Sequence, residues 1–166
     1  MESKETDLDS LRTRIKSDAL RLLTFKPRSI GELRSRLEKK KYPAELVDEA
    51  IEVLTRQGFL DDEKFARLYA QSSVYSKPTG KRQLEFDLKR KGLSKELVSR
   101  TRGDMKDYDE KALGRDLVRK RLPQMRDVPP AKQKARLFGF LKRRGFGSEA
   151  IFDVFGEVFK TGGAFE

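Results

Sequence analysis

The chain has 166 residues, of which 38 are lysine or arginine and 27 are aspartate or glutamate, so its formal net charge is +11. It contains neither cysteine nor histidine, which excludes disulfides, thiolate zinc sites, cysteine nucleophiles and imidazole ligands or bases. We therefore expect a protein without catalytic activity, with no metal ion and no cofactor.

The chain begins with an acidic, polar stretch over residues 1–10, which lacks the basic start and apolar core of a secretory signal. No later segment approaches the apolar length of a membrane span. Charged residues make up 39% and hydrophobic residues 36%, enough for small cores but not for one large interior. We expect a polar N-terminal tail, no membrane association and a cytoplasmic location.

A motif of two leucines four residues apart occurs three times, at offsets of 51 and 53 residues. In each copy a basic triplet follows, and an apolar residue lies five positions after the second leucine, as expected for a helix and its end. A glutamate also lies eight residues after the second leucine of each copy. Three tandem repeats are therefore predicted. The leucine pairs are Leu33 and Leu37, Leu84 and Leu88, and Leu137 and Leu141.

The turn after each of these helices is encoded in two of the three copies. Gly92 and Gly145 are placed to adopt a left-handed conformation, with Leu93 and Phe146 packing back on the preceding helix in a Schellman stop. The first copy has Lys41 instead. Either Lys41 is left-handed, at a cost on the order of 1 kcal/mol, or that helix ends differently.

Further helix boundaries follow from capping signals along the chain. Ser29 with Glu32 and Asp107 with Glu110 fit the capping-box pattern. The remaining signals are Pro43 and Pro130 in first turns, Gly58 as a stop, Asp62 near a helix start, and Ser94 as an N-cap.

These elements predict an all-α fold of three tandem three-helix repeats. The repeats are expected over residues 11–57, 61–105 and 108–160, with polar tails over 1–10 and 161–166. Because a module of about 50 residues buries little on its own, neighbouring repeats should pack end to end. We expect an elongated, curved molecule.

Clusters of basic residues are the candidate partner-binding site, because a basic surface favours nucleic acid or an acidic protein groove. The triplets also suit helix C-termini, where the dipole favours cations without further purpose. Lys81 and Arg82 are the strongest candidates, since neither lies in a last turn. The candidates are Arg34, Arg36, Lys39, Lys40, Lys77, Lys81, Arg82, Lys89, Arg90, Arg119, Lys120, Arg121, Lys142, Arg143 and Arg144.

Two other features are better explained by helix capping and core packing than by a binding site. The acidic run at residues 61–63 opens a predicted helix, where capping explains it better than a metal site. Most aromatic residues lie at helical spacing with other apolar residues and should be core. Phe86 and either Phe138 or Phe140 are exceptions, because they lie outside the helix face that carries the leucine pair.

The segment Gly58–Tyr69, then Lys77–Arg82 and Leu84–Gly92, resembles the most characteristic stretch of the RecX family. The elements Gly-Phe-Leu-Asp-Asp, Phe-Ala and Lys-Arg-Lys-Gly-Leu are specific in combination, and the similarity extends over almost the whole chain. The resemblance implies a non-catalytic regulator that binds the RecA filament on single-stranded DNA. It also implies inhibition of the recombinase, ATPase and coprotease activities of RecA.

Two alternatives remain open. A three-helix unit with basic helix ends is also suited to bind single- or double-stranded DNA directly. An enzyme using only Asp, Glu, Lys or Arg is the other, but no two such residues stand at a recognisable catalytic spacing. We expect a monomer that contacts the filament, with direct DNA contact as the alternative.

Overall fold

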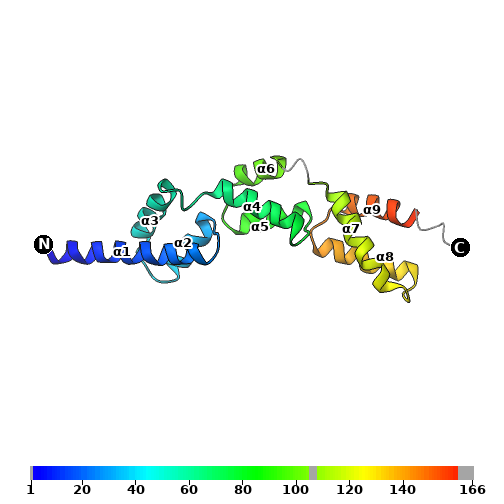
Figure 1. Cartoon of the computed structure of the whole chain (residues 1–166), viewed down its shortest axis with the longest axis horizontal. Helices are drawn as coiled ribbons and strands as arrows, with labels where there is room; N and C mark the ends of the chain where they lie inside the picture. The colour runs from blue at the N-terminus through cyan, green and yellow to red at the C-terminus, as the bar shows by residue number, and fades with distance from the viewer. Residues whose placement is uncertain (1, 105–107, 161–166) are drawn as a thin grey trace. The chain divides into compact units, whose positions relative to one another are not determined.

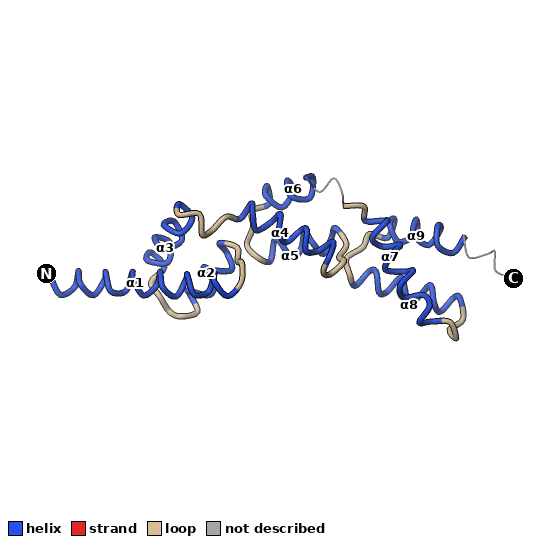
Figure 2. Tube along the Cα trace, in the orientation of Figure 1, coloured by secondary structure: helices blue, strands red, loops and turns tan. Residues whose placement is uncertain are grey.

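The computed structural model describes residues 2–104 and 108–160. Within these ranges the chain forms nine α-helices and one short 3-10 helix and no strand, which confirms the all-α class (Figure 1 and Figure 2). The helices are α1 (Glu2–Phe25), α2 (Ile30–Glu38), α3 (Ala44–Arg56), α4 (Asp62–Tyr75), α5 (Lys81–Arg90), α6 (Lys95–Asp104), α7 (Glu110–Arg121), η1 (Leu122–Met125), α8 (Pro130–Arg143) and α9 (Ser148–Lys160).

The N-terminus differs from the expected polar tail, because residues 2–10 form the first turns of the long helix α1. Helix formation there does not need an apolar face, since ion pairs three or four residues apart support a polar helix. Arg12 makes such a pair with Asp9 at 3.0 Å and also reaches Glu49 of α3. The predicted C-terminal tail, residues 161–166, lies outside the described residues.

Helices α1, α2 and α3 form the first repeat around one apolar core. The leucine pair of α2 faces inward as predicted, with Leu33 and Leu37 fully buried. The predicted capping box is confirmed: the Glu32 N–H donates to Ser29 Oγ, and the Ser29 N–H donates to the Glu32 carboxylate. The buried residues of this core are Ile15, Ala19, Leu33, Leu37, Val47, Ala50, Ile51, Leu54 and Leu60.

Helices α7, α8 and α9 form the third repeat around a second core. Its first helix is capped by Asp109, whose carboxylate accepts the N–H groups of Lys111 and Ala112. The predicted cap Asp107 lies outside the described residues, and Glu110 uses its side chain elsewhere. The buried residues of this core are Val118, Leu137, Leu141, Phe146, Ile151 and Val154.

The helix stops adopt the predicted left-handed turns. Gly92 and Gly145 have φ angles of 84° and 81°, and the N–H groups of Leu93 and Phe146 donate to the carbonyls of Leu88 and Leu141. Lys41 has φ 62°, so the first copy is also left-handed at this position despite its side chain. Gly58 is likewise left-handed, at 76°.

The chain divides into two compact units. One unit contains the residues up to Arg67 together with Leu88–Leu97, and the other contains Leu68–Asp87 together with the residues from Val98 onward. In the part of the chain that is described, no helix combines the length and apolarity that crossing a membrane requires.

Candidate functional site

The start of helix α2 packs directly on the turn that ends α5, and we call this contact the first junction. Ser29 Oγ donates to the Lys91 carbonyl, and the Ile30 N–H donates to Asp62 Oδ1 at 2.8 Å. A Cβ on Gly31 would lie 2.8 Å from the same carbonyl. Glycine is therefore required for this approach of backbone to backbone. All of these residues belong to one compact unit.

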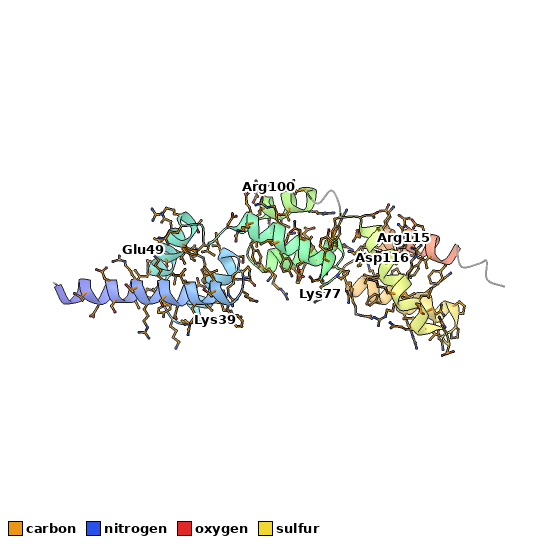
Figure 3. All side chains as sticks on the ribbon, in the orientation of Figure 1. Lys39, Glu49, Lys77, Arg100, Arg115 and Asp116 are labelled. Carbon is orange, nitrogen blue, oxygen red and sulfur yellow. The ribbon has the colours of Figure 1, made fainter. Side chains whose placement is uncertain are left out.

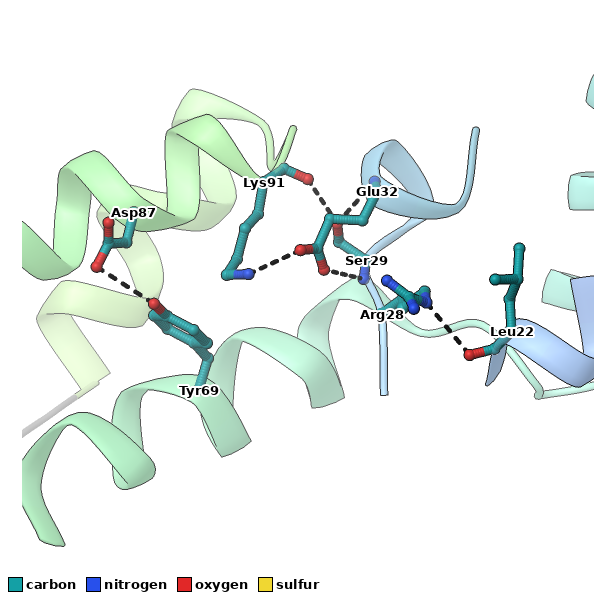
Figure 4. A network of polar contacts seen from close by, with 7 residues as sticks. All are labelled: Leu22, Arg28, Ser29, Glu32, Tyr69, Asp87 and Lys91. Atoms are coloured by element: carbon teal, nitrogen blue, oxygen red, sulfur yellow. Dashed lines mark hydrogen bonds and ion pairs between the residues drawn. The ribbon is translucent and has the colours of Figure 1, made fainter. Parts of the chain in front are cut away.

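An ion pair reinforces the first junction (Figure 4). Lys91 Nζ lies 2.8 Å from Glu32 Oε1, and the two side chains are only 18% and 22% exposed. Burial raises the pKa of Glu32, but the hydrogen bond and charge of Lys91 outweigh it and hold that pKa below its ordinary value. Glu32 therefore stays ionised while capping α2 and pairing across the junction.

A small polar pocket opens beside these residues. Its volume is about 190 Å³. Its walls bring together two candidate cations from different repeats, Arg36 of α2 and Arg90 of α5. Both side chains are exposed and lie at the mouth of the pocket. The full lining is Arg28, Gly31, Glu32, Ser35, Arg36, Arg90, Lys91 and Gly92.

The start of α5 meets the end of α8 in the same way, and we call this contact the second junction. The Gly80 N–H donates to the Arg144 carbonyl at 2.7 Å, and the Lys81 N–H donates to Glu110 Oε1 at 3.0 Å. A Cβ on Gly80 would lie 2.2 Å from the Gly145 carbonyl oxygen. As at the first junction, an acidic side chain from the following repeat accepts a hydrogen bond from the backbone N–H of the first residue of the helix.

A cationic cluster lies next to the second junction. The guanidinium carbons of Arg121 and Arg144 lie 4.3 Å and 5.0 Å from the centre of the Phe140 ring. Arg144 also donates to the Pro78 carbonyl at 3.0 Å, which fixes the loop ahead of α5. Because the ring faces attract cations, Phe140 holds together two candidate residues from separate basic triplets. We call Arg121, Phe140 and Arg144 the Phe140 cluster.

Other candidate cations have partners within the chain that account for their position. Arg34 pairs with Asp48, and Lys40 pairs with Asp18. Lys40 and the Tyr42 hydroxyl together lower the pKa of Asp18. These two cations therefore act as structural residues of the first repeat.

Lys81, a leading candidate by sequence, occupies a structural position. Its N–H belongs to the second junction, and its ammonium lies 5.9 Å from the centre of the Tyr108 ring. Arg82, the next residue, is exposed. Of this pair, Arg82 is the side chain available to a partner.

The remaining candidates lie on the surface. Lys39 caps the end of α2, and Lys77 lies in the loop before α5; both are labelled in Figure 3. Lys142 lies near the Phe138 ring and donates to Ser148. The other exposed candidates are Lys89, Arg119, Lys120 and Arg143.

Sequence reasoning missed the junctions, since they join residues from 29 to 64 positions apart. The prediction that Phe86 lies outside the core is confirmed, since its side chain is 57% exposed. Phe140 lies between two arginines. The acidic run behaves as helix-opening residues, with Asp61 accepting the Lys64 N–H and Asp62 serving the first junction. Among the described residues, no group of three acidic side chains is placed to hold a metal ion.

Comparison with known proteins identifies the repeats. Models of the first, second and third three-helix domains of RecX match residues 16–54, 61–101 and 108–155, respectively. The regulatory protein RecX of Chlorobium phaeobacteroides (strain BS1) is 32% identical over 143 residues, covering 86% of this chain and 92% of the relative. That of Trichlorobacter lovleyi (strain ATCC BAA-1151 / DSM 17278 / SZ) is 38% identical, covering 82% and 90%.

Solved structures share the fold. The crystal structure of RecX from Lactobacillus salivarius superposes with a TM-score of 0.78 at 16% identity, covering 92% of this chain and 99% of that one. Three matched domains in their expected order, with relatives above 30% identity over most of their length, agree with the fold built from the residues. The chain belongs to the RecX family of regulatory proteins.

Proposed function

We propose that this protein binds the RecA nucleoprotein filament on single-stranded DNA and inhibits its recombinase, ATPase and coprotease activities. It acts by occupying the filament, without catalysing a reaction, as a monomer in the cytoplasm. Membership of a family of regulatory proteins supports the regulatory role. The contacts with the filament are inferred from the residues of the two junctions.

The observation that carries the proposal is that both junctions gather cations from two helices. Arg36 and Arg90 line the pocket of the first junction, and Arg121 and Arg144 flank Phe140 at the second. No acidic side chain pairs with Arg121 or Arg144 in the described part of the chain. The positive charge of Arg121 and Arg144 is therefore left for a partner.

Two cationic junctions on one chain suit a partner that repeats the same binding surface. A ligand that attaches at one point holds its second point at a high effective concentration, so two weak contacts give strong overall binding. A filament presents the same surface again on each protomer. Two such points on one chain would let it attach to more than one protomer.

Direct binding to DNA is the second candidate function, and the exposed Phe86 favours it. Phe86 lies four residues after Arg82 on α5, so the two side chains share one helix face. An exposed ring beside a guanidinium is suited to stack on unpaired bases. This function predicts tight binding to bare single strands with a steep dependence on salt.

Titrating this protein into RecA on single-stranded DNA at fixed salt, and measuring the RecA ATPase activity, tests the proposal. We expect the parent to inhibit, and the double variant Arg36→Glu, Arg121→Glu to require roughly ten times more protein, a shift equivalent to about 1.4 kcal/mol. The matched control is Arg56→Glu, Arg126→Glu, which makes the same charge change at exposed residues away from both junctions.

Three outcomes are informative. Inhibition by the parent and the control, with weak inhibition by the junction variant, supports the proposal. Equal weakening of both variants shows that net charge alone matters and contradicts the role of the junctions. No inhibition by the parent, together with tight binding to bare single-stranded DNA, contradicts the proposal and supports direct nucleic-acid binding.

A further inference from the structure

An apolar groove runs between helices α8 and α9 of the third repeat, separate from both junctions. Its volume is about 530 Å³, and it is open to solvent. One wall comes from α8 and the other from one face of α9, with positions three or four residues apart on each helix. The lining residues are Lys134, Ala135, Phe138, Phe152, Phe155, Gly156 and Phe159.

Aromatic rings form most of this groove. The Phe138 and Phe152 rings lie 5.7 Å apart across it, and the Phe155 and Phe159 rings meet edge to face at 5.3 Å. Phe152 nonetheless remains 63% exposed. Large rings left in contact with water indicate a surface that another molecule covers.

Gly156 keeps the groove open. It lies inside α9, where glycine is less favourable than alanine in helix propensity. A Cβ at this position would meet no atom within 4 Å, so packing within the chain does not require glycine. Any larger side chain here would enter the groove between the surrounding rings.

Two lysines of α8 give the groove a positive rim. Lys134 and Lys142 lie four residues on either side of Phe138, on the same helix face. Their ammonium groups lie 4.9 Å from the Phe159 ring centre and 6.0 Å from the Phe138 ring centre, respectively. An apolar floor between two cations favours a ligand with apolar side chains flanked by carboxylates.

Two of the three acidic residues of α9 are paired away from this rim. Asp153 pairs with Lys111, and Glu157 pairs with Arg115 at 2.9 Å, both on helix α7. These two carboxylates are therefore engaged by α7, and the third acidic residue, Glu149, acts electrostatically on the same Lys111. Ser148, which accepts a hydrogen bond from Lys142, is neutral.

We propose that this groove binds an acidic, amphipathic peptide segment of a partner protein. Its apolar side chains would lie among the four phenylalanines, and its carboxylates would pair with Lys134 and Lys142. This mode corresponds to an amphipathic segment in a hydrophobic groove. Charge complementarity selects an acidic segment over a basic one, and the apolar lining disfavours a nucleic-acid backbone. The proposal is independent of inhibition through the junctions.

Fluorescence anisotropy tests the proposal with the full chain and no RecA. The probe is a fluorescein-labelled 14-residue peptide with leucines at helical positions 3, 6, 7 and 10 and glutamates at most others; a second probe has lysine in place of glutamate. We expect only the acidic probe to bind. Gly156→Leu fills the groove and should weaken binding at least tenfold, and Lys134→Glu, Lys142→Glu should do the same.

Lys132→Glu is the matched control, because Lys132 is an exposed residue of α8 that does not line the groove. Its binding should stay within twofold of the parent. Circular dichroism melting establishes that each variant is folded. Unchanged binding by folded Gly156→Leu, or equal weakening by Lys132→Glu, overturns the proposal.

The same variants distinguish an acidic peptide from other occupants of the groove. Sedimentation equilibrium of the parent should give a monomer; a dimer that Gly156→Leu dissociates would identify the groove as a self-association surface and overturn the proposal. Displacement of the probe by an equimolar single-stranded oligonucleotide from the parent, but not from Lys134→Glu, Lys142→Glu, would likewise overturn it in favour of nucleic acid.

Discussion

Replacing Gly80 by alanine should disrupt the second junction. The added Cβ would lie 2.2 Å from the Gly145 oxygen, 2.3 Å from its carbonyl carbon and 2.4 Å from the Phe146 nitrogen. All three are backbone atoms, so the two helix ends must separate by more than 1 Å to reach ordinary contact. Overpacking of this kind costs about 1–3 kcal/mol, and the stretched Gly80–Arg144 hydrogen bond adds about 1 kcal/mol.

The expected loss of roughly 2–4 kcal/mol lowers the melting temperature by about 5–15 °C, measured by circular dichroism or calorimetry. Gly156→Ala is the control, since its Cβ meets nothing within 4 Å and it lies in the same compact unit. That variant should keep or raise the melting temperature. A Gly80→Ala protein as stable as the parent would refute the close packing at this junction.

Three further predictions concern the first repeat. Lys41→Gly should raise the unfolding free energy by about 1 kcal/mol in urea denaturation, because Lys41 is left-handed; a decrease would contradict this. Glu32→Gln should lower it by about 1–3 kcal/mol by weakening the pair with Lys91, and an unchanged midpoint would count against the ion pair. The pKa of Asp18 is lowered in the folded state, so its contribution is present above about pH 4 and is lost as the pH falls. Asp18→Asn should therefore lose less stability than the parent between pH 6 and pH 3, measured by thermal melting, and parallel curves would refute it.

Local signals predicted much of the fold. The capping box at Ser29 and the stops at Gly92 and Gly145 depend on residues within six positions of one another, so their spacing in the sequence is sufficient. The first turns of α1 were not predicted, since residues 2–10 have no apolar periodicity. Their helix is supported by ion pairs such as Arg12 with Asp9.

The candidate site was predicted only as a set of cations. Spacing cannot distinguish Lys40, which pairs with Asp18, from Arg36, which lines the first-junction pocket. That distinction depends on contacts between distant segments. Glu110 illustrates the same limit: its position suggested a capping box, but its carboxylate accepts an N–H from a residue 29 positions earlier.

Thiol labelling of single-cysteine variants tests most directly whether the junctions contact the RecA filament. Because the chain has no cysteine, Arg36→Cys, Arg121→Cys and the control Arg56→Cys each introduce one thiol, whose labelling rate mass spectrometry can follow with and without RecA on single-stranded DNA. We predict that the filament slows labelling at positions 36 and 121 and leaves position 56 unchanged. Equal rates at all three positions at saturating filament would contradict the account.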